Sequence, residues 1–217
     1  MPDYAQQRRN MIEAQIRAND VTDTRVQAAM GEIARERFVP AARRAVAYAD
    51  VPVEVVAGRY LMDPRSFAKL VQLAGIKPTD TVLDVGCATG YSTAILARLA
   101  SHVVALEQDA DLVRIAIDML QAVKASNAEV VQGGLAEGYK AKAPYDVIFV
   151  NGAIETEPGK LLSQLAEGGR LVAIMRKGEL GRAQLFVCRD GRIGSRIDFD
   201  ASVPLLAGFR APAGFVF

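Results

Sequence analysis

Asp84, Gly86, Gly90 and Glu107 are the residues of this sequence whose types and spacing could do chemistry. The apolar run TVLDV contains Asp84 and leads into the turn GCATG, and Glu107 ends the next apolar run, VVALE. Glycine lets the backbone approach a ligand closely, and a carboxylate can accept hydrogen bonds from both hydroxyls of a ribose. One helix and one strand would span the interval between Gly86 and Glu107, so these residues fit a nucleoside site in one β-α-β unit.

Two phosphate-containing ligands fit this turn poorly. A P-loop needs a lysine followed by serine or threonine after its last glycine, whereas Tyr91 and Ser92 follow Gly90 here. A dinucleotide-binding turn has three glycines, which let the backbone approach a pyrophosphate. In this sequence Ala88 replaces the middle glycine and the third glycine is displaced, so a pyrophosphate is disfavoured.

S-adenosylmethionine fits the same residues better, because it carries no phosphate. Asp84 would bind its ammonium group and Glu107 its ribose diol, with bare backbone at residues 86–90 lying against the nucleoside. Its sulfonium is an activated leaving group, so methyl transfer depends mainly on positioning and on exclusion of water. A carboxylate acceptor is ionised at pH 7 and needs no general base. This agrees with a chain whose single histidine is His102.

Alternating strands and helices from residue 78 onward would position these residues. The pattern predicts an α/β fold with a doubly wound, mostly parallel sheet, whose ligand lies at the carboxyl ends of the strands. The final stretch, 183–206, predicts an antiparallel hairpin with its turn at Asp190 and Gly191. The expected strands are 81–86, 103–108, 128–134, 145–153 and 168–176, and the expected helices are 90–100, 109–124 and 158–166.

The first part of the chain predicts helices instead. Asp63 is a natural N-cap, Pro64 fits the first turn of a helix, and Gly75 would end it. We therefore expect an N-terminal helical subdomain over residues 1–77 that covers the cleft, and a cofactor-binding domain over residues 78–217. The other helices expected in the first part are 4–18, 24–33 (capped by Asp23 or Thr22) and 41–47.

Composition narrows the possible partners. The chain has 217 residues, 51% of them hydrophobic, and a formal net charge of +1, which gives no electrostatic signature for nucleic acid or for an anionic membrane surface. No apolar run is long enough to span a bilayer, and the N-terminus does not resemble a secretory signal. Cys87 and Cys188 make no disulfide framework, and one histidine is too few for a zinc site. We expect a cytoplasmic protein without a metal, and its oligomeric state stays open.

Several blocks of the sequence together resemble one known family. They are RRNMIEAQIRANDVTDTRVQAAMGEIARERFVP, AYADVPVEV, VLDVGCATGYSTAILARLASHVVALEQDADLVRIA, APYDVIFVNGAIE and LLSQLAEGGRLVAI. They are similar to the protein-L-isoaspartate O-methyltransferases, which methylate the abnormal carboxylate of isoaspartyl residues so that damaged proteins can be repaired. The resemblance implies a Rossmann-like sheet, N-terminal helices packed over the cleft, and S-adenosylmethionine as the cofactor.

The sequence departs from that family in the loop before Pro64. The family usually has glycine, glutamine and then Thr-Ile-Ser there, with hydroxyls beside the methyl acceptor. This chain has Tyr60 at the threonine position and Met62 at the serine position. Tyr60 could supply a hydroxyl and Arg59 could pair with an acceptor carboxylate, so these two are our candidate catalytic residues. The alternative is that the loop repacked after isoaspartyl recognition was lost.

A second departure follows the third strand, where the family commonly has Gly-Asp-Gly. This chain has Gly133, Gly134 and Leu135, so backbone groups such as the amide of Leu135 would have to recognise the adenine, unless Gln132 or Glu137 compensates. The missing acid would weaken cofactor binding by ~1–3 kcal/mol.

The expected cofactor-binding residues share a position at the ends of the first four strands. An Asn-Pro-Pro-aromatic run at Asn151 would indicate methylation of a base or amide nitrogen, but both prolines are absent. Three alternative functions remain: a methyltransferase with a small-molecule acceptor, a cofactor-binding paralogue without activity and, more distantly, a NAD-dependent oxidoreductase. The expected residues are Asp84, Gly86, Cys87, Ala88, Gly90, Glu107, Gln108, Gly134, Leu135 and Asn151.

Overall fold

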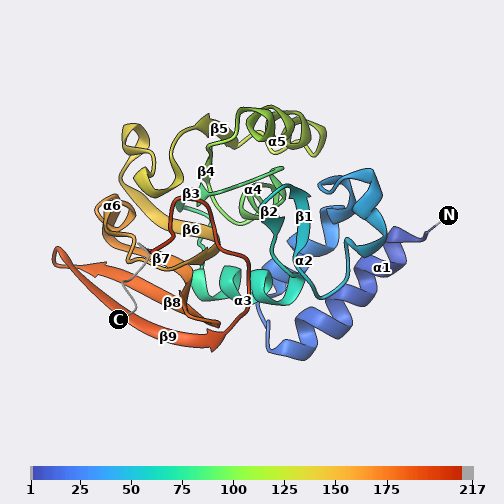
Figure 1. The fold of residues 1–217 in the computed structure, drawn as a ribbon, viewed down its shortest axis with the longest axis horizontal. Coiled ribbons are helices and arrows are strands. Elements are labelled where there is room, and N and C mark those ends of the chain that lie inside the picture. The colour runs from blue at the N-terminus through green and yellow to red at the C-terminus, as the bar shows by residue number, and fades with distance from the viewer. Residues whose placement is uncertain (1, 212–217) are drawn as a thin grey trace, which may run out of the picture.

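A seven-stranded sheet forms the centre of the computed structural model, which describes residues 2–211 (Figure 1). The strand order is β5-β4-β3-β6-β7-β8-β9. Strands β3 to β7 pair in parallel, and β8 and β9 are antiparallel to their neighbours, which confirms the predicted fold class. The order reverses between β3 and β6, so the switch point lies beside β3. The bounds are β3 (Thr81–Val85), β4 (His102–Glu107), β5 (Ala128–Gln132), β6 (Tyr145–Ile154), β7 (Leu165–Lys177), β8 (Leu180–Arg189) and β9 (Arg192–Asp200).

Both faces of the parallel strands are buried, which explains their nearly continuous apolar sequences. Successive side chains of a strand point to opposite faces. Val82 of β3 therefore belongs to one hydrophobic cluster, together with Phe67 and the N-terminal helices. Leu83 and Val85 belong to a second cluster on the other face, together with Leu161 of α6.

The helical segments lie largely where the sequence predicts them. The first is an α-helix that continues as one π-helical and one 3₁₀ turn, and the helix expected over 41–47 is a 3₁₀ helix, Ala41–Val46. The α-helices are α1 (Tyr4–Met11), α2 (Thr24–Glu32), α3 (Pro64–Ala74), α4 (Tyr91–Leu96), α5 (Ala110–Ala122) and α6 (Gly159–Leu162).

Two elements differ from the prediction. The helix expected over 158–166 is wrong at its end, because α6 is a single turn and β7 already begins at Leu165. The pairing of β7 with β6 shifts register after Leu165, and Gly168 has a φ of +74°, so an irregularity lets the strand start before the glycine pair. A short antiparallel hairpin, β1 (Val53–Val56) and β2 (Arg59–Leu61), was not expected.

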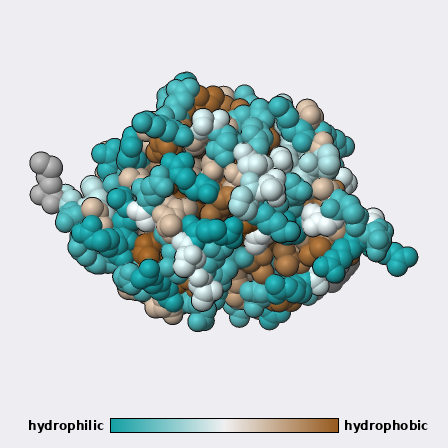
Figure 2. Space-filling view, turned by 180° about the vertical axis from the view of Figure 1, so that it is seen from behind, coloured by the Kyte–Doolittle hydropathy of each residue, from teal (hydrophilic) through white to brown (hydrophobic). Residues whose placement is uncertain are grey.

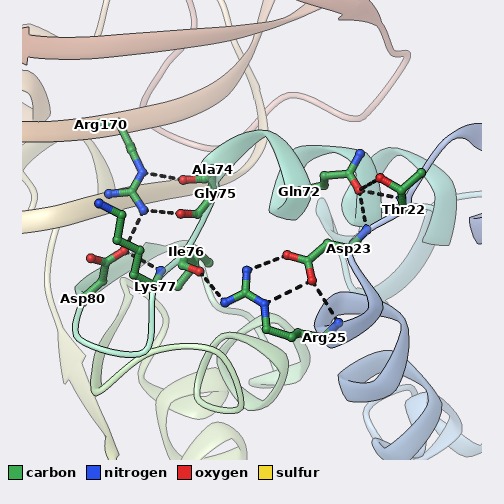
Figure 3. A network of polar contacts seen from close by, with 10 residues as sticks. All are labelled: Thr22, Asp23, Arg25, Gln72, Ala74, Gly75, Ile76, Lys77, Asp80 and Arg170. Carbon is green, nitrogen blue, oxygen red and sulfur yellow. Dashed lines mark hydrogen bonds and ion pairs between the residues drawn. The ribbon is translucent and has the colours of Figure 1, made fainter.

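Polar contacts at the C-terminal end of α3 tie this helix to the sheet (Figure 3). Asp63 caps the helix by accepting from the amide of Ser66 at 2.8 Å, and Gly75 ends it in the left-handed conformation, as predicted. Arg170 of β7 donates to the carbonyls of Ala74 and Gly75 at 2.5 and 2.6 Å. A cation is favourable at this end of a helix.

The N-terminal part and the sheet share a core. Met11 and Ile16 belong to the same buried cluster as Val82 and Ile174, so the division at residue 77 stays a prediction. Hydrophilic side chains cover most of the face shown in Figure 2, with hydrophobic residues visible between them. Among residues 2–211, no helix has both the length and the apolar character needed to cross a membrane.

Candidate functional site

Glu107 lies at the carboxyl end of β4 and is fully buried. Backbone amides hold its carboxylate in place: the amide of Ala88 donates to Oε2 at 2.9 Å, and those of Gln108 and Asp109 donate to Oε1 at 2.8 and 3.2 Å. The end of the strand and the glycine turn thus orient one carboxylate between them.

The glycine turn has the backbone conformation that its sequence predicts. Gly86 and Gly90 have φ values of +78° and +91°, which suit glycine. A side chain at Gly90 would lie 3.5 Å from the Cα of Ala116, so this glycine also lets α5 pack closely. Cys87 is buried, and burial raises the pKa of its thiol well above the ordinary value, so it stays protonated and is a poor nucleophile.

Asp84 is buried one residue before the end of β3. Its carboxyl accepts from the hydroxyls of Ser92 and Thr93 at 2.8 and 2.6 Å, and from the amide of Asn151. Burial raises the pKa of Asp84 to about 6, against the opposing effect of these hydrogen bonds. The structure thus joins two predicted residues, Asp84 and Asn151, and the binding of an ammonium group by Asp84 stays a prediction.

The two candidate catalytic residues lie on the β1–β2 hairpin with different surroundings. Arg59 was expected to pair with an acceptor carboxylate, but its partner in the structure is Glu107: Nη1 and Nη2 lie 2.5 and 2.7 Å from Oε1 and Oε2. Tyr60 is partly exposed, and a hydrogen bond with Glu54 raises the pKa of its hydroxyl. Met62 is buried and presents no polar group at the serine position of the family.

The residues expected around the adenine lie at the ends of β4 and β5. Gln108 and Gly134 are exposed and Leu135 is buried. The side chain of Gln132 donates to the carbonyl of Gln108 at 3.3 Å, and Glu137 pairs with Lys160. Recognition of adenine by these backbone groups stays a prediction.

The space above the glycine turn is filled by side chains of this chain. A Cβ at Gly86 would lie 2.9 Å from Leu206 and 3.4 Å from the Arg59 guanidinium. The two cavities beside Gly86 and Gly152 each hold about 10 Å³, whereas ligand pockets measure about 300–1,000 Å³. A nucleoside lying against bare backbone at residues 86–90 stays a prediction, and in this conformation Leu206 and Arg59 cover Gly86.

Larger hollows lie elsewhere on the surface. They measure 490, 470 and 570 Å³, and they lie between α1 and α2, beside α5 and along β8 and β9. None of the three contains a predicted site residue. Glu107 is a carboxylate of the kind that binds a diol, but in this conformation Arg59 pairs with it and Leu206 fills the space beside Gly86.

Several residues at the site were not predicted from the sequence. Leu206 reaches Gly86 because the segment after β9 returns to the end of β6, where its amide donates to the carbonyl of Ala153 at 2.8 Å (Figure 1). Arg35 is fully buried, donates to the carbonyl of Met62 at 2.6 Å and lies 4.8 Å from the centre of the Tyr91 ring. Neither contact has a local sequence signal. Ser92 and Thr93 did have one, because hydroxyls in the first turn after the glycine can face an acid at the strand end.

Known proteins resemble this chain along nearly its whole length. The curated protein-L-isoaspartate O-methyltransferases of Koribacter versatilis and Methanoculleus marisnigri are 37% and 38% identical to it, over 94% and 86% of this chain and 92% and 85% of theirs. A solved protein-L-isoaspartate O-methyltransferase has a TM-score of 0.80 at 24% identity, covering 93% of this chain and 66% of that one.

A second solved structure agrees in fold. It is a putative protein-L-isoaspartate O-methyltransferase from Plasmodium falciparum in complex with S-adenosyl-L-homocysteine, with a TM-score of 0.79 at 21% identity over 95% of this chain and 99% of that one. The family model for protein-L-isoaspartate(D-aspartate) O-methyltransferase matches residues 6–201, which include both the glycine turn and the β1–β2 hairpin. This chain therefore belongs to the protein-L-isoaspartate(D-aspartate) O-methyltransferase family.

Proposed function

We propose that this chain transfers a methyl group from S-adenosylmethionine to the side-chain carboxylate of an isoaspartyl residue in a damaged peptide or protein. The observation that carries this proposal is the family match over residues 6–201. The same match favours this acceptor over a small molecule and over a paralogue without activity. The fold adds a buried carboxylate and a glycine turn at the switch point of the sheet, where ligands of α/β folds bind.

The chain's own residues would bind and orient the reactants. When bound, the cofactor supplies a methyl group on a positively charged sulfur, and the neutral thioether that remains is a good leaving group. Glu107 would accept hydrogen bonds from the two hydroxyls of the cofactor's ribose. The turn at Gly86 and Gly90 would let the protein backbone approach the cofactor closely. Gln108, Gly134 and Leu135 would lie along its base.

No general base is required for a carboxylate acceptor, because the acceptor is ionised at neutral pH. The position of the single histidine agrees with this. His102 begins β4, whereas Glu107 ends it, so the two are roughly 17 Å apart along the strand. Its ring lies 3.0 Å from Glu129, and we assign it no part in the reaction.

The acceptor would be held by the β1–β2 hairpin. Tyr60 presents a phenol on the exposed side of β2, and Arg59 carries a guanidinium that can bind a carboxylate through two parallel hydrogen bonds. In this conformation Glu107 pairs with that guanidinium, so Arg59 must leave Glu107 before it binds an acceptor.

We place the reaction in the cytoplasm, because Cys87 and Cys188 are both free, as a reducing compartment favours.

The decisive experiment is transfer of a labelled methyl group. The full chain is incubated with labelled S-adenosylmethionine and an isoaspartyl peptide, with the normal aspartyl peptide of the same sequence as the control. We expect label in the isoaspartyl peptide only, released by mild base as a methyl ester is. Tyr60→Phe should lower kcat/KM for the peptide about 3–10-fold. Equal labelling of both peptides, or of neither, would contradict the proposal.

A further inference from the structure

The carboxylate of Glu107 is already saturated with hydrogen bonds. Besides the amides of Ala88, Gln108 and Asp109, it accepts two parallel bonds from the guanidinium of Arg59. Only 9% of the Arg59 side chain and none of the Glu107 side chain is exposed. A carboxylate offers about four lone-pair positions, and these five bonds already exceed that number, so a further donor can bind only by displacing one of them.

The guanidinium occupies the place that a ribose would need. Two adjacent hydroxyls present two parallel donors to a carboxylate, and so do the two terminal nitrogens of an arginine. The three backbone amides are fixed by the end of β4 and by the turn, so Arg59 is the donor that can withdraw. We propose that Arg59 is a built-in competitor of the cofactor, which closes the site until the nucleoside takes Glu107 from it.

A second side chain completes the closure from the opposite end of the sequence. Leu206 is 4% exposed and lies against Gly86, where a Cβ would have both methyl groups of Leu206 and Nη2 of Arg59 as its nearest neighbours. Its segment lies on β6 through bonds between Ala153 and the backbone of Pro204 and Leu206, at 2.9 and 2.8 Å. The site is therefore closed by the guanidinium of Arg59 and the apolar side chain of Leu206.

The hairpin that carries Arg59 has an exposed tip and a buried base. It forms its own two-stranded sheet, separate from the seven-stranded one, so no strand of the central sheet holds its backbone by hydrogen bonds. Its tip at Ala57 and Gly58 is exposed, and nothing lies within 4 Å of the side-chain position of Gly58. Buried Val53 and Leu61 anchor its base. A shift of the tip would carry the guanidinium away from Glu107 while the anchors stay in place.

Withdrawal would also give Arg59 a second use. This step rests on the proposed function: the released guanidinium is the group expected to bind the acceptor carboxylate. Arg59 therefore opposes binding of the nucleoside and supports binding of the peptide. A residue with a purely structural contribution would not move these two affinities in opposite directions.

The test is calorimetric titration of the full chain with S-adenosylhomocysteine. When the open state is only a small fraction of the molecules, the apparent affinity is reduced by that fraction. We therefore expect Arg59→Ala to bind S-adenosylhomocysteine at least about tenfold more tightly than the natural chain does. Arg59→Lys keeps a charge but not the two parallel bonds, so its affinity should lie between those of the other two proteins. Arg65→Ala is the matched control, because Arg65 also pairs with an acid, Asp50, but at the surface.

Each outcome decides the inference. Equal or weaker binding by Arg59→Ala, with circular dichroism showing a folded chain, would overturn it. If Arg59→Ala does not fold, Leu206→Ala serves instead, and it too should bind more tightly; unchanged affinity there would contradict the closure. Tighter binding by Arg59→Ala with no methyl transfer by the natural chain to isoaspartyl peptide would refute the proposed function alone. Methyl transfer with no gain in affinity would refute the competitor alone.

Discussion

Glu107 and Arg59 form an ion pair in which Arg59 depends on Glu107 more than Glu107 depends on Arg59. The pair lies beneath the surface, where attraction between charges is strong but an unpaired charge is costly. The amides around Glu107 would still stabilise its charge without Arg59, whereas Arg59 has no other acid among its hydrogen-bond or ion-pair partners in residues 2–211. Loss of the carboxylate should therefore cost more than loss of the guanidinium.

Glu107→Gln should reduce the free energy of unfolding by about 3 kcal/mol, because it leaves a buried guanidinium without a counter-charge. Urea denaturation at pH 7 would measure the loss. Glu137→Gln is the control, since it removes an acid from a surface pair with Lys160 and should cost less than about 1 kcal/mol. Equal losses in the two variants would show that the buried pair contributes no more than the surface one.

The positions of Asp84 and Glu107 could be predicted because both are local features: each is an acid at or next to the end of an apolar run, and Asp84 is followed by a glycine turn. The partner of Arg59 could not. It lies 48 positions along the chain, and an arginine beside the acceptor loop fits an external carboxylate as well as an internal one. Leu206 at Gly86 is a contact of the same kind, set by the return of the chain after β9.

Helix α3 shows the same contrast at the level of an element. Its bounds follow from Asp63, Pro64 and Gly75, and the structure confirms them. Its attachment to β7 does not follow from the local sequence, because Arg170 reaches the carbonyl of Ala74 from 96 positions away. Arg170 also pairs with Asp80 at 2.6 Å, which in turn accepts from the amide of Lys77 (Figure 3).

Arg170→Met should destabilise the chain by about 2–4 kcal/mol, because it leaves the carbonyls at the end of α3 and the carboxylate of Asp80 without their main donor. The side chain of Arg170 is 15% exposed, so water can replace little of what is lost. Thermal and urea unfolding would measure the effect. Arg182→Met is the control: its pair with Asp200 on the neighbouring strands is long, at 3.5 Å, and exposed. A loss no greater than that of the control would contradict this account.

Across the whole molecule, the alternation of strands and helices was predictable because a parallel sheet buried on both faces leaves long apolar runs in the sequence. The β1–β2 hairpin was not, since its strands have four and three residues and too few positions to show a period. The same holds for the one-turn helix α6. Short elements depend on their neighbours for their conformation, and those neighbours are distant in sequence.

The stability of the whole chain should depend on pH through Asp84. Its pKa is about 6 in the folded chain against 3.8 for an ordinary aspartate, and burial is the main cause. Between these two values the folded chain holds a proton that the unfolded chain has released, so this group stabilises the fold at low pH and the contribution is lost as the pH rises through 6. The difference amounts to ~3 kcal/mol.

Asp84→Asn should remove that dependence, because an amide carries no charge: its oxygen can still accept from Ser92 and Thr93, and its nitrogen can donate to the oxygen of Asn151 once that amide turns over. Asp23, Glu129 and Glu155 have lowered pKa values and act in the opposite direction in both chains, so the difference between variant and natural chain isolates Asp84. We expect the free energy of unfolding of the variant, relative to the natural chain, to rise by about 2–3 kcal/mol from pH 4 to pH 7 in a series of urea titrations. Asp111→Asn, at an exposed position, should leave the pH profile unchanged. A constant difference between Asp84→Asn and the natural chain would mean that Asp84 is ionised throughout and that its three donors outweigh its burial.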